Sequence, residues 1–215
     1  MDWSFLRVFS SKTWLRLGVV FAGFVLLVTL FVELADEVRE QGTVRFDTAF
    51  LEYVNTFSSP LLDTFFIITT HLGGVFTVIA ITLSLSVLLW RHHLRRKALF
   101  LSVSVGGAAL LNLLLKAVFE RQRPELWERL VLEQSYSFPS GHAMASSALA
   151  LCLVVIFWPT RWRWVVIGSA AVYVLVVGFS RLYLGVHYPT DIVAGWLVSA
   201  TWVIITWLVL GFKKK

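Results

Sequence analysis

Three short polar stretches stand out in a sequence that is otherwise strongly apolar. They are KAVFERQRP from Lys116 to Pro124, FPSGH from Phe138 to His142, and SRLYLGVHYPTD from Ser180 to Asp191. Together they hold histidines, cations and a carboxylate. Ionisable groups at the ends of membrane-buried segments are costly, and binding a charged ligand is the usual reason for their presence. Because cations predominate, the stretches indicate that the ligand is a phosphate.

The residues of PSGH and the three cations suit the binding of a phosphoryl group. Ser140 is a natural helix cap, and Gly141 leaves room for close approach, so the first amides of the following helix can face an anion at the positive end of the helix dipole. Lys116, Arg123 and Arg181 can surround the remaining oxygens. The arginines would do so by two-pronged hydrogen bonds and the lysine as a point charge.

The third stretch contains the residues that could react with this phosphate. His187 lies just before Pro189, which suits the first position of a helix, and Asp191 follows four residues after the histidine. A carboxylate that accepts a proton from one ring nitrogen would leave the other free to attack, which makes His187 the candidate nucleophile. His142 could protonate a departing alcohol oxygen and then activate water.

Other charged residues of this region have simpler explanations. Arg121 and Arg129 lie among several glutamates and are predicted to belong to a solvated charged loop, with a role in headgroup selection as the alternative. A single histidine near a helix start is usually structural. The functional interpretation of His142 and His187 therefore depends on the combination of all three stretches.

The composition is that of an integral membrane protein. Hydrophobic residues make up 58% of the 215 residues and charged residues 15%, against about 25% in an average soluble domain. Six apolar runs are long enough for membrane-spanning helices. They lie near residues 15–35, 64–90, 98–118, 142–159, 164–180 and 190–212.

The remaining segments complete an all-α prediction. The stretch 41–63 has apolar residues at loosely helical intervals and is predicted to form an amphipathic helix at the membrane surface. Gly73 and Gly74, within the second run, favour close helix packing or a kink. Without an internal repeat or a low-complexity linker, residues 1–215 are predicted to form one domain.

The distribution of charge predicts the orientation in a cell membrane. With six spans, both termini lie on the same side of the membrane as the loops at 91–97 and 161–163. This side holds 12 of the 19 basic residues and only one of the 13 acidic residues. The positive-inside rule makes that side cytoplasmic. All three polar stretches then fall on the outer face. The net charge of +6 is explained by topology, so no nucleic-acid partner is expected.

The three stretches resemble the signature of the type 2 phosphatidic acid phosphatase superfamily of membrane lipid phosphatases. KAVFERQRP matches its pattern of K, six residues and RP, and FPSGH matches PSGH. SRLYLGVHYPTD matches SR, five residues, H, three residues and D. The match covers residues 116–191 with every signature residue present, and the six-span layout agrees with the family.

This resemblance implies a six-helix transmembrane bundle and a phosphatase that needs no metal or other cofactor and acts through a phosphohistidine. The implied catalytic residues are His187 as nucleophile, Asp191 as its orienting partner and His142 as general acid and base. The implied phosphate ligands are Lys116, Arg123, Ser140, Gly141 and Arg181.

The expected substrate is a lipid phosphate, because a pocket at the outer helix ends suits a molecule whose tails stay in the phospholipid bilayer. Resemblance to bacterial members favours phosphatidylglycerophosphate, with undecaprenyl pyrophosphate and phosphatidic acid as alternatives. Two other functions use the same residues. One is a phosphotransferase with the same intermediate, and the other is a lipid-phosphate binder or transporter without catalysis.

Overall fold

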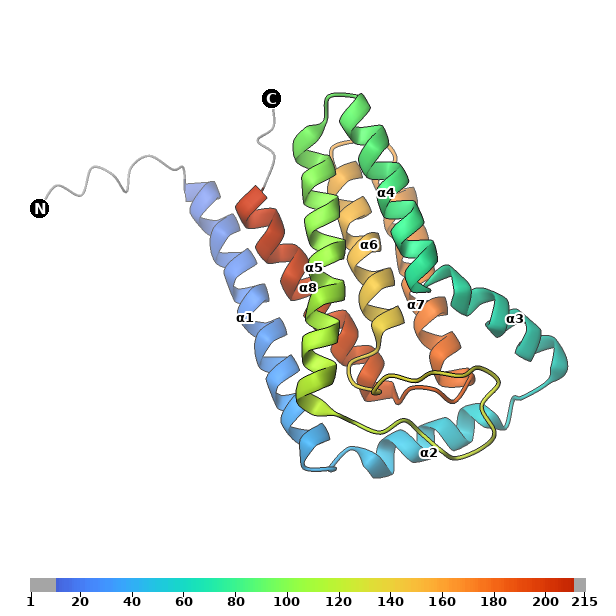
Figure 1. The fold of residues 1–215 in the computed structure, drawn as a ribbon. Helices are drawn as coiled ribbons and strands as arrows, with labels where there is room; N and C mark the ends of the chain where they lie inside the picture. The colour runs from blue at the N-terminus through green and yellow to red at the C-terminus, as the bar shows by residue number, and fades with distance from the viewer. Residues whose placement is uncertain (1–10, 211–215) are drawn as a thin grey trace, which may run out of the picture.

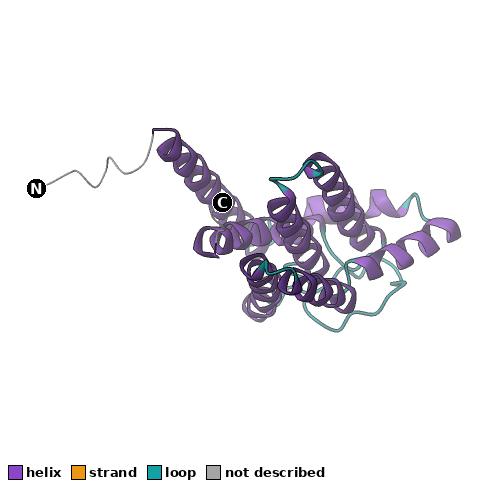
Figure 2. Cartoon of the chain, turned by 90° about the horizontal axis from the view of Figure 1, so that it is seen from above, coloured by secondary structure: helices purple, strands orange, loops and turns teal. Residues whose placement is uncertain are grey.

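Every regular element that the computed structural model describes is an α-helix. The described part of the chain is residues 11–210, which leaves residues 1–10 and 211–215 outside it. Figure 2 accordingly shows only helices and loops in this part, as the all-α prediction requires. The helices are α1 (Ser11–Arg39), α2 (Val44–Asn55), α3 (Pro60–Leu72), α4 (Val75–Arg91), α5 (Arg95–Phe119), α6 (Gly141–Phe157), α7 (Arg163–Tyr183) and α8 (Pro189–Leu210).

Helix α6 lies at the centre of the bundle and packs against α4, α5, α7 and α8 (Figure 1). Its sequence between His142 and Phe157 has no charged residue, so it can be surrounded by other helices without burying an unpaired charge. The main core cluster joins Phe100 and Leu101 of α5 to Ala148 and Cys152 of α6. Helix α1 flanks this core and packs along α8.

The number of membrane spans is lower than predicted when each helix is judged by length and hydropathy. Four helices qualify alone, namely α1 from Gly18 onward, α5, α7 and α8, and the bent pair α3 and α4 makes a fifth. Helix α6 is apolar but has 17 residues, or about 26 Å at 1.5 Å per residue, which is short for a 30 Å hydrocarbon core. A sixth span therefore remains a prediction.

The run predicted as one span over 64–90 is divided into α3 and α4. The two helices meet at an angle of 42° at Gly73 and Gly74, which confirms the predicted kink. A Cβ atom on Gly73 would lie 2.2 Å from Cγ1 of Val177 in α7. The glycine thus allows the end of α3 to approach α7 closely.

The predicted surface helix is shorter than the stretch 41–63. Helix α2 covers Val44–Asn55, and the chain then turns before Pro60 begins α3. In Figure 1, α2 runs across the end of the bundle, below the loop that joins α5 to α6. Its buried side chains are Asp47, Leu51 and Val54, spaced on one helical face. An acid on the buried face of an amphipathic helix is unusual.

The two ends of the bundle carry different connections (Figure 1). The start of α1 and the end of α8 lie at the same end as the turns between α4 and α5 and between α6 and α7. The opposite end holds α2, the loop of residues 120–140 and the turn of residues 184–188. All three polar stretches therefore meet at one end of the molecule. The chain termini, with Lys213 to Lys215, lie outside the described residues.

Candidate active site

The predicted site residues lie at or next to the ends of helices, on the same end of the bundle. The last turn of α5 carries Lys116, and the helix stops when Glu120 takes a left-handed conformation with φ of 45°. The loop that follows carries Arg123 and returns to α6 at Gly141. The last turn of α7 carries Arg181, and a tight turn through Gly185, with φ of 67°, leads to His187 at the start of α8.

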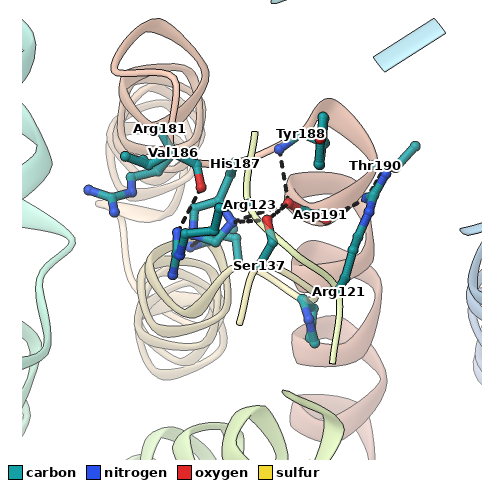
Figure 3. A network of polar contacts seen from close by, with 12 residues as sticks. Arg121, Arg123, Ser137, Arg181, Val186, His187, Tyr188, Thr190 and Asp191 are labelled. Atoms are coloured by element: carbon teal, nitrogen blue, oxygen red, sulfur yellow. Dashed lines mark hydrogen bonds and ion pairs between the residues drawn. The ribbon is translucent and has the colours of Figure 1, made fainter. Parts of the chain in front are cut away.

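His187 and Asp191 form a buried pair. Nδ1 of His187 lies 3.2 Å from Oδ2 of Asp191, and the side chains are 1% and 0% exposed. The same oxygen accepts hydrogen bonds from the backbone N–H of Tyr188, at 2.9 Å, and from the hydroxyl of Ser137. The spacing of four residues at a helix start therefore does bring the histidine and the carboxylate together, as the sequence predicts (Figure 3).

The second nitrogen of His187 faces Arg123. Its Nε2 atom lies 3.0 Å from Nη1 of the guanidinium, which also donates to the carbonyl of Val186 at 2.7 Å. A guanidinium can only donate, so Nε2 must be the acceptor and carry the lone pair, whereas Nδ1 carries the proton that faces Asp191. Figure 3 shows the ring between these two partners. This tautomer is the one that a nucleophilic Nε2 requires.

Burial and nearby cations keep His187 neutral. Burial lowers its pKa well below the ordinary histidine value, and the charges of Arg123, Arg181 and Lys116 lower it further. Burial likewise lowers the pKa of Arg123 from its usual value, against the opposing effect of Glu133 and Asp191. The imidazole is therefore neutral at neutral pH, which is the form in which Nε2 has a lone pair.

The three cations of the site converge on residues 133–136 of the long loop. Nζ of Lys116 donates to Oγ of Ser135, at 2.8 Å, and to the carbonyl of Tyr136, at 2.6 Å. Nε of Arg123 donates to the carbonyl of Ser135 at 2.7 Å. Glu133 pairs with Arg181 and lies 3.7 Å from Arg123. A carboxylate already occupies part of the cationic site.

Arg181 is almost fully buried and retains an unused donor. Its Nη1 donates to Oγ1 of Thr70 at 2.6 Å, but the buried Nε has no hydrogen-bond partner among residues 11–210. A cavity of about 500 Å³ lies beside the other two cations and is lined by Lys116, Arg123 and Glu133, among other residues of α5 and the loop, but not by Arg181. The cationic side chains of Lys116 and Arg123 could hold an anion there.

The PSGH stretch begins α6 as predicted. Ser140 is the N-cap, and its Oγ accepts from the backbone N–H of Ala143 at 3.4 Å. The backbone N–H of Ser140 donates to the carbonyl of Asp191 at 3.1 Å, which ties this helix start to that of α8. His142 follows in the first turn, partly exposed, with Arg181 and His187 among its electrostatic neighbours.

A Cβ atom on Gly141 would lie 3.0 Å from Oδ1 of Asn112, so the glycine lets α5 approach the first turn of α6. Together with the residues described above, this places all the site residues predicted from sequence at one end of the bundle. Among residues 11–210 no group of three or more histidines, cysteines or acids could hold a metal ion.

The prediction for Arg121 was wrong, and four other residues were missed. Arg121 is not a solvated loop residue: its side chain is 11% exposed and forms ion pairs with Asp47 and Asp191. The sequence did not predict that Ser137 contacts the pair of His187 and Asp191, or that Glu133 contacts the cations. The one available signal was for Asp47, since a charge on the apolar face of a predicted amphipathic helix needs a partner. The missed residues are Asp47, Thr70, Glu133 and Ser137.

Comparison with known proteins identifies the family of this chain. Residues 97–215 match the model of the PAP2 superfamily. The chain is 29% identical over 197 residues to phosphatidylglycerophosphatase B of Bacillus subtilis, covering 89% of this chain and 95% of that protein. It is 26% identical over 180 residues to undecaprenyl-diphosphatase of Sulfolobus acidocaldarius, covering 81% and 82%.

The fold also matches a solved structure. The crystal structure of a transmembrane PAP2 type phosphatidylglycerolphosphate phosphatase from Bacillus subtilis superposes with a TM-score of 0.79 at 26% sequence identity, covering 85% of this chain and 93% of that one. The family match includes more than half of the residues, the relatives are phosphatases, and the apolar helices are those of a multi-pass membrane protein. The chain therefore belongs to the PAP2 superfamily of phosphatases.

Proposed function

We propose that this protein hydrolyses a lipid phosphate monoester or pyrophosphate through a phosphohistidine formed on His187. The observation that carries the proposal is the arrangement of the His187 ring, with Nδ1 facing Asp191 at 3.2 Å and Nε2 facing Nη1 of Arg123 at 3.0 Å. Asp191 orients the neutral imidazole, and Arg123 could turn from Nε2 to an oxygen of the bound phosphate, which would free the lone pair of Nε2. This geometry suits attack on phosphorus.

In the first step, Nε2 of His187 forms a bond to phosphorus and the bond from phosphorus to the leaving oxygen breaks. His142 enters this step in its protonated form, which the negative charge of the bound phosphate favours. It donates its proton to that oxygen, so the leaving group departs as an alcohol, or as a lipid monophosphate when the substrate is a pyrophosphate. The imidazole gains positive charge as it attacks. The carboxylate of Asp191, which accepts from Nδ1, stabilises that charge.

In the second step, water attacks the phosphohistidine. His142, now the base, takes a proton from the water, the bond between phosphorus and Nε2 breaks, and inorganic phosphate leaves. His187 returns to its neutral form. The same residue serves as acid and then as base, so the cycle closes without another proton donor.

The charge that develops on the phosphoryl oxygens would be stabilised by Lys116, Arg123 and Arg181, together with the first amides of α6 at Ser140 and Gly141. Support comes from the unpartnered Nε of Arg181 and from the carboxylate of Glu133 among these cations. A bound phosphate would replace Glu133 and take over contacts that the loop now makes.

A lipid substrate is supported by an apolar groove between α3, α7 and α8. It holds about 400 Å³ and its lining includes Phe66, Leu182, Ile192 and Trp196. Leu182 and Ile192 directly follow Arg181 and Asp191 in the chain, so an acyl or prenyl tail in the groove would lie beside the site. By analogy with the named relatives, phosphatidylglycerophosphate is the proposed substrate, with undecaprenyl pyrophosphate and phosphatidic acid as further candidates.

A phosphate-release assay on the purified protein tests the proposal. Phosphatidylglycerophosphate, undecaprenyl pyrophosphate, phosphatidic acid and diacylglycerol pyrophosphate are compared as substrates. His187→Ala should abolish release while the lipid still binds, and alkaline quenching of the wild type should trap radioactive phosphate on the protein. The matched control is His92→Ala, an exposed histidine at the other end of the bundle. Unchanged turnover in His187→Ala would contradict the nucleophile assignment.

The same assay separates the alternatives. Free phosphate equal to the lipid consumed indicates a hydrolase, a deficit that grows with added acceptor alcohols indicates a phosphotransferase, and capture without consumption indicates a binder or transporter.

Metal independence is a second prediction. The phosphate oxygens are expected to contact cations and amides of the protein, whereas magnesium prefers carboxylate oxygens and water. EDTA should therefore leave the rate of phosphate release within about twofold of the rate without EDTA, because groups of the protein alone are proposed to stabilise the transition state. Loss of activity in EDTA and recovery with Mg²⁺ alone would overturn this account.

A further inference from the structure

An ion pair between Asp47 and Arg121 lies behind the pair of His187 and Asp191, and neither residue is at a position that the signature specifies. We propose that these two residues position Asp191, and through it His187, for the transfer of the phosphoryl group. The inference rests on the proposed function, and it adds two positioning residues to it, one of them from the surface helix α2.

Arg121 is bound on both sides of its guanidinium. Nη1 donates to Oδ1 of Asp191 at 2.6 Å and to Oγ1 of Thr190 at 2.8 Å. Nη2 donates to Oδ2 of Asp47 at 2.7 Å. The guanidinium carbon also lies 4.2 Å from the ring centre of Tyr188, within the range of a cation–π contact. Figure 3 shows Arg121 on the side of Asp191 away from His187.

Asp47 holds both Arg121 and the start of α8. Its side chain is fully buried, and its two oxygens accept from the backbone N–H of Thr190, at 3.2 Å, and from the hydroxyl of Thr190, at 2.7 Å. The first amides of a helix have no partner within the helix. Asp47 supplies one from α2, at the positive end of the helix dipole, directly before Asp191.

These contacts determine which oxygen of Asp191 faces His187. Oδ1 is taken by Arg121, so Oδ2 is left to face Nδ1, held by the N–H of Tyr188 and the hydroxyl of Ser137. Apart from His187, the only ion-pair partner of Asp191 among residues 11–210 is Arg121. A fully buried carboxylate that loses its cation becomes easier to protonate and free to rotate. In either event Nδ1 loses the acceptor that orients the ring.

Neither residue needs to touch the substrate for this effect. The hydrogen bonds of Arg121 and Asp47 are directed at each other, at Asp191 and at the neighbouring Thr43 and Thr190. Phosphate binding should therefore survive their removal, whereas the reactive orientation of His187 should not. The expected signature is a fall in kcat with little change in KM.

The experiment compares Arg121→Ala and the nearly isosteric Asp47→Asn with the wild type in the phosphate-release assay. We expect kcat to fall by about 10- to 100-fold, with KM within about threefold of the wild-type value. The size of this fall is taken from metal sites, where removing the residues that orient the ligating histidines lowers activity by a similar factor. Guanidinium chloride added to Arg121→Ala should restore kcat in a saturable manner, and methylammonium chloride at the same concentration should not. Matched controls on α2 are Arg45→Ala and Glu52→Gln, both exposed.

The remaining outcomes overturn the inference. They are unchanged kcat in both variants, a rise in KM at constant kcat, or equal recovery with both cations. Asp47→Asn keeps the shape of the side chain, so it reports on the network even if Arg121→Ala fails to fold. Different results would contradict the proposed function itself. These are a wild type that releases no phosphate from any lipid, or a His187→Ala variant that remains active.

Discussion

At the scale of residues, the proposed chemistry depends on the different partners of the two nitrogens of the His187 ring. Asp191 can only accept and Arg123 can only donate, so the tautomer of His187 follows from the identities of its neighbours. Ser137 and the N–H of Tyr188 hold the carboxylate in place. A histidine in this position is neutral, oriented and close to the proposed phosphate site.

The lowered pKa of His187 predicts the pH dependence of kcat/KM, which reports on the free enzyme. Burial and three cations disfavour the protonated ring, so the nucleophilic form persists below pH 6.5 and is lost only as the pH falls through the lowered pKa. The acidic limb of the profile should therefore lie below 6.5. Measuring it with both a lipid monophosphate and a lipid pyrophosphate separates this group from the ionisation of the substrate. An acidic limb at 6.5 or above with both substrates would contradict the prediction.

At the scale of elements, the candidate site is formed where helices begin and end. Helix α5 ends at Phe119 and α7 ends at Tyr183, whereas α6 begins at Gly141 and α8 begins at Pro189. Helix ends expose unpaired amides and carbonyls, and the positive ends of α6 and α8 face the region where negative charge is proposed to develop. Helix α2 supports this arrangement from the surface through Asp47.

The turn after α7 should be sensitive to a single methyl group. Gly185 has φ of 67°, and a Cβ atom there would lie 2.8 Å from Cε2 of Trp127. Gly185→Ala should lower the thermal unfolding temperature, with a cost of about 1–3 kcal/mol for the strained backbone, and should lower kcat/KM because His187 lies two residues on. The control is Gly168→Ala, within α7, where nothing lies within 4 Å. Equal stability and activity of the two variants would show that the turn tolerates the side chain.

At the scale of the whole molecule, charge and function divide between the two ends of the bundle. The turns at 92–94 and 158–162 belong to the basic end, and the loop 120–140 with the proposed active site belongs to the end where acids predominate. By the positive-inside rule, we propose that the active site faces outward from the cell membrane and that both termini are cytoplasmic. Lipid phosphates of the outer leaflet would then be the accessible substrates.

Cysteine labelling in intact cells tests this orientation. Glu128→Cys, in the exposed part of the loop, should react with a membrane-impermeant maleimide from outside, and Arg161→Cys should react only after permeabilisation. The native Cys152 is buried and should contribute little background. The opposite labelling pattern would reverse the proposed topology.

The sequence by itself determined the helical class, the kink at Gly73 and Gly74, and the grouping of three polar stretches, because each depends on local composition and spacing. The pairing of His187 with Asp191 belongs with these, since four residues at a helix start set it. Only the tertiary structure showed that Arg121 is buried and that Asp47 caps α8, because Asp47 contacts residues 74 and 143 positions away along the chain. Contacts of that separation depend on how helices pack, which no local pattern encodes.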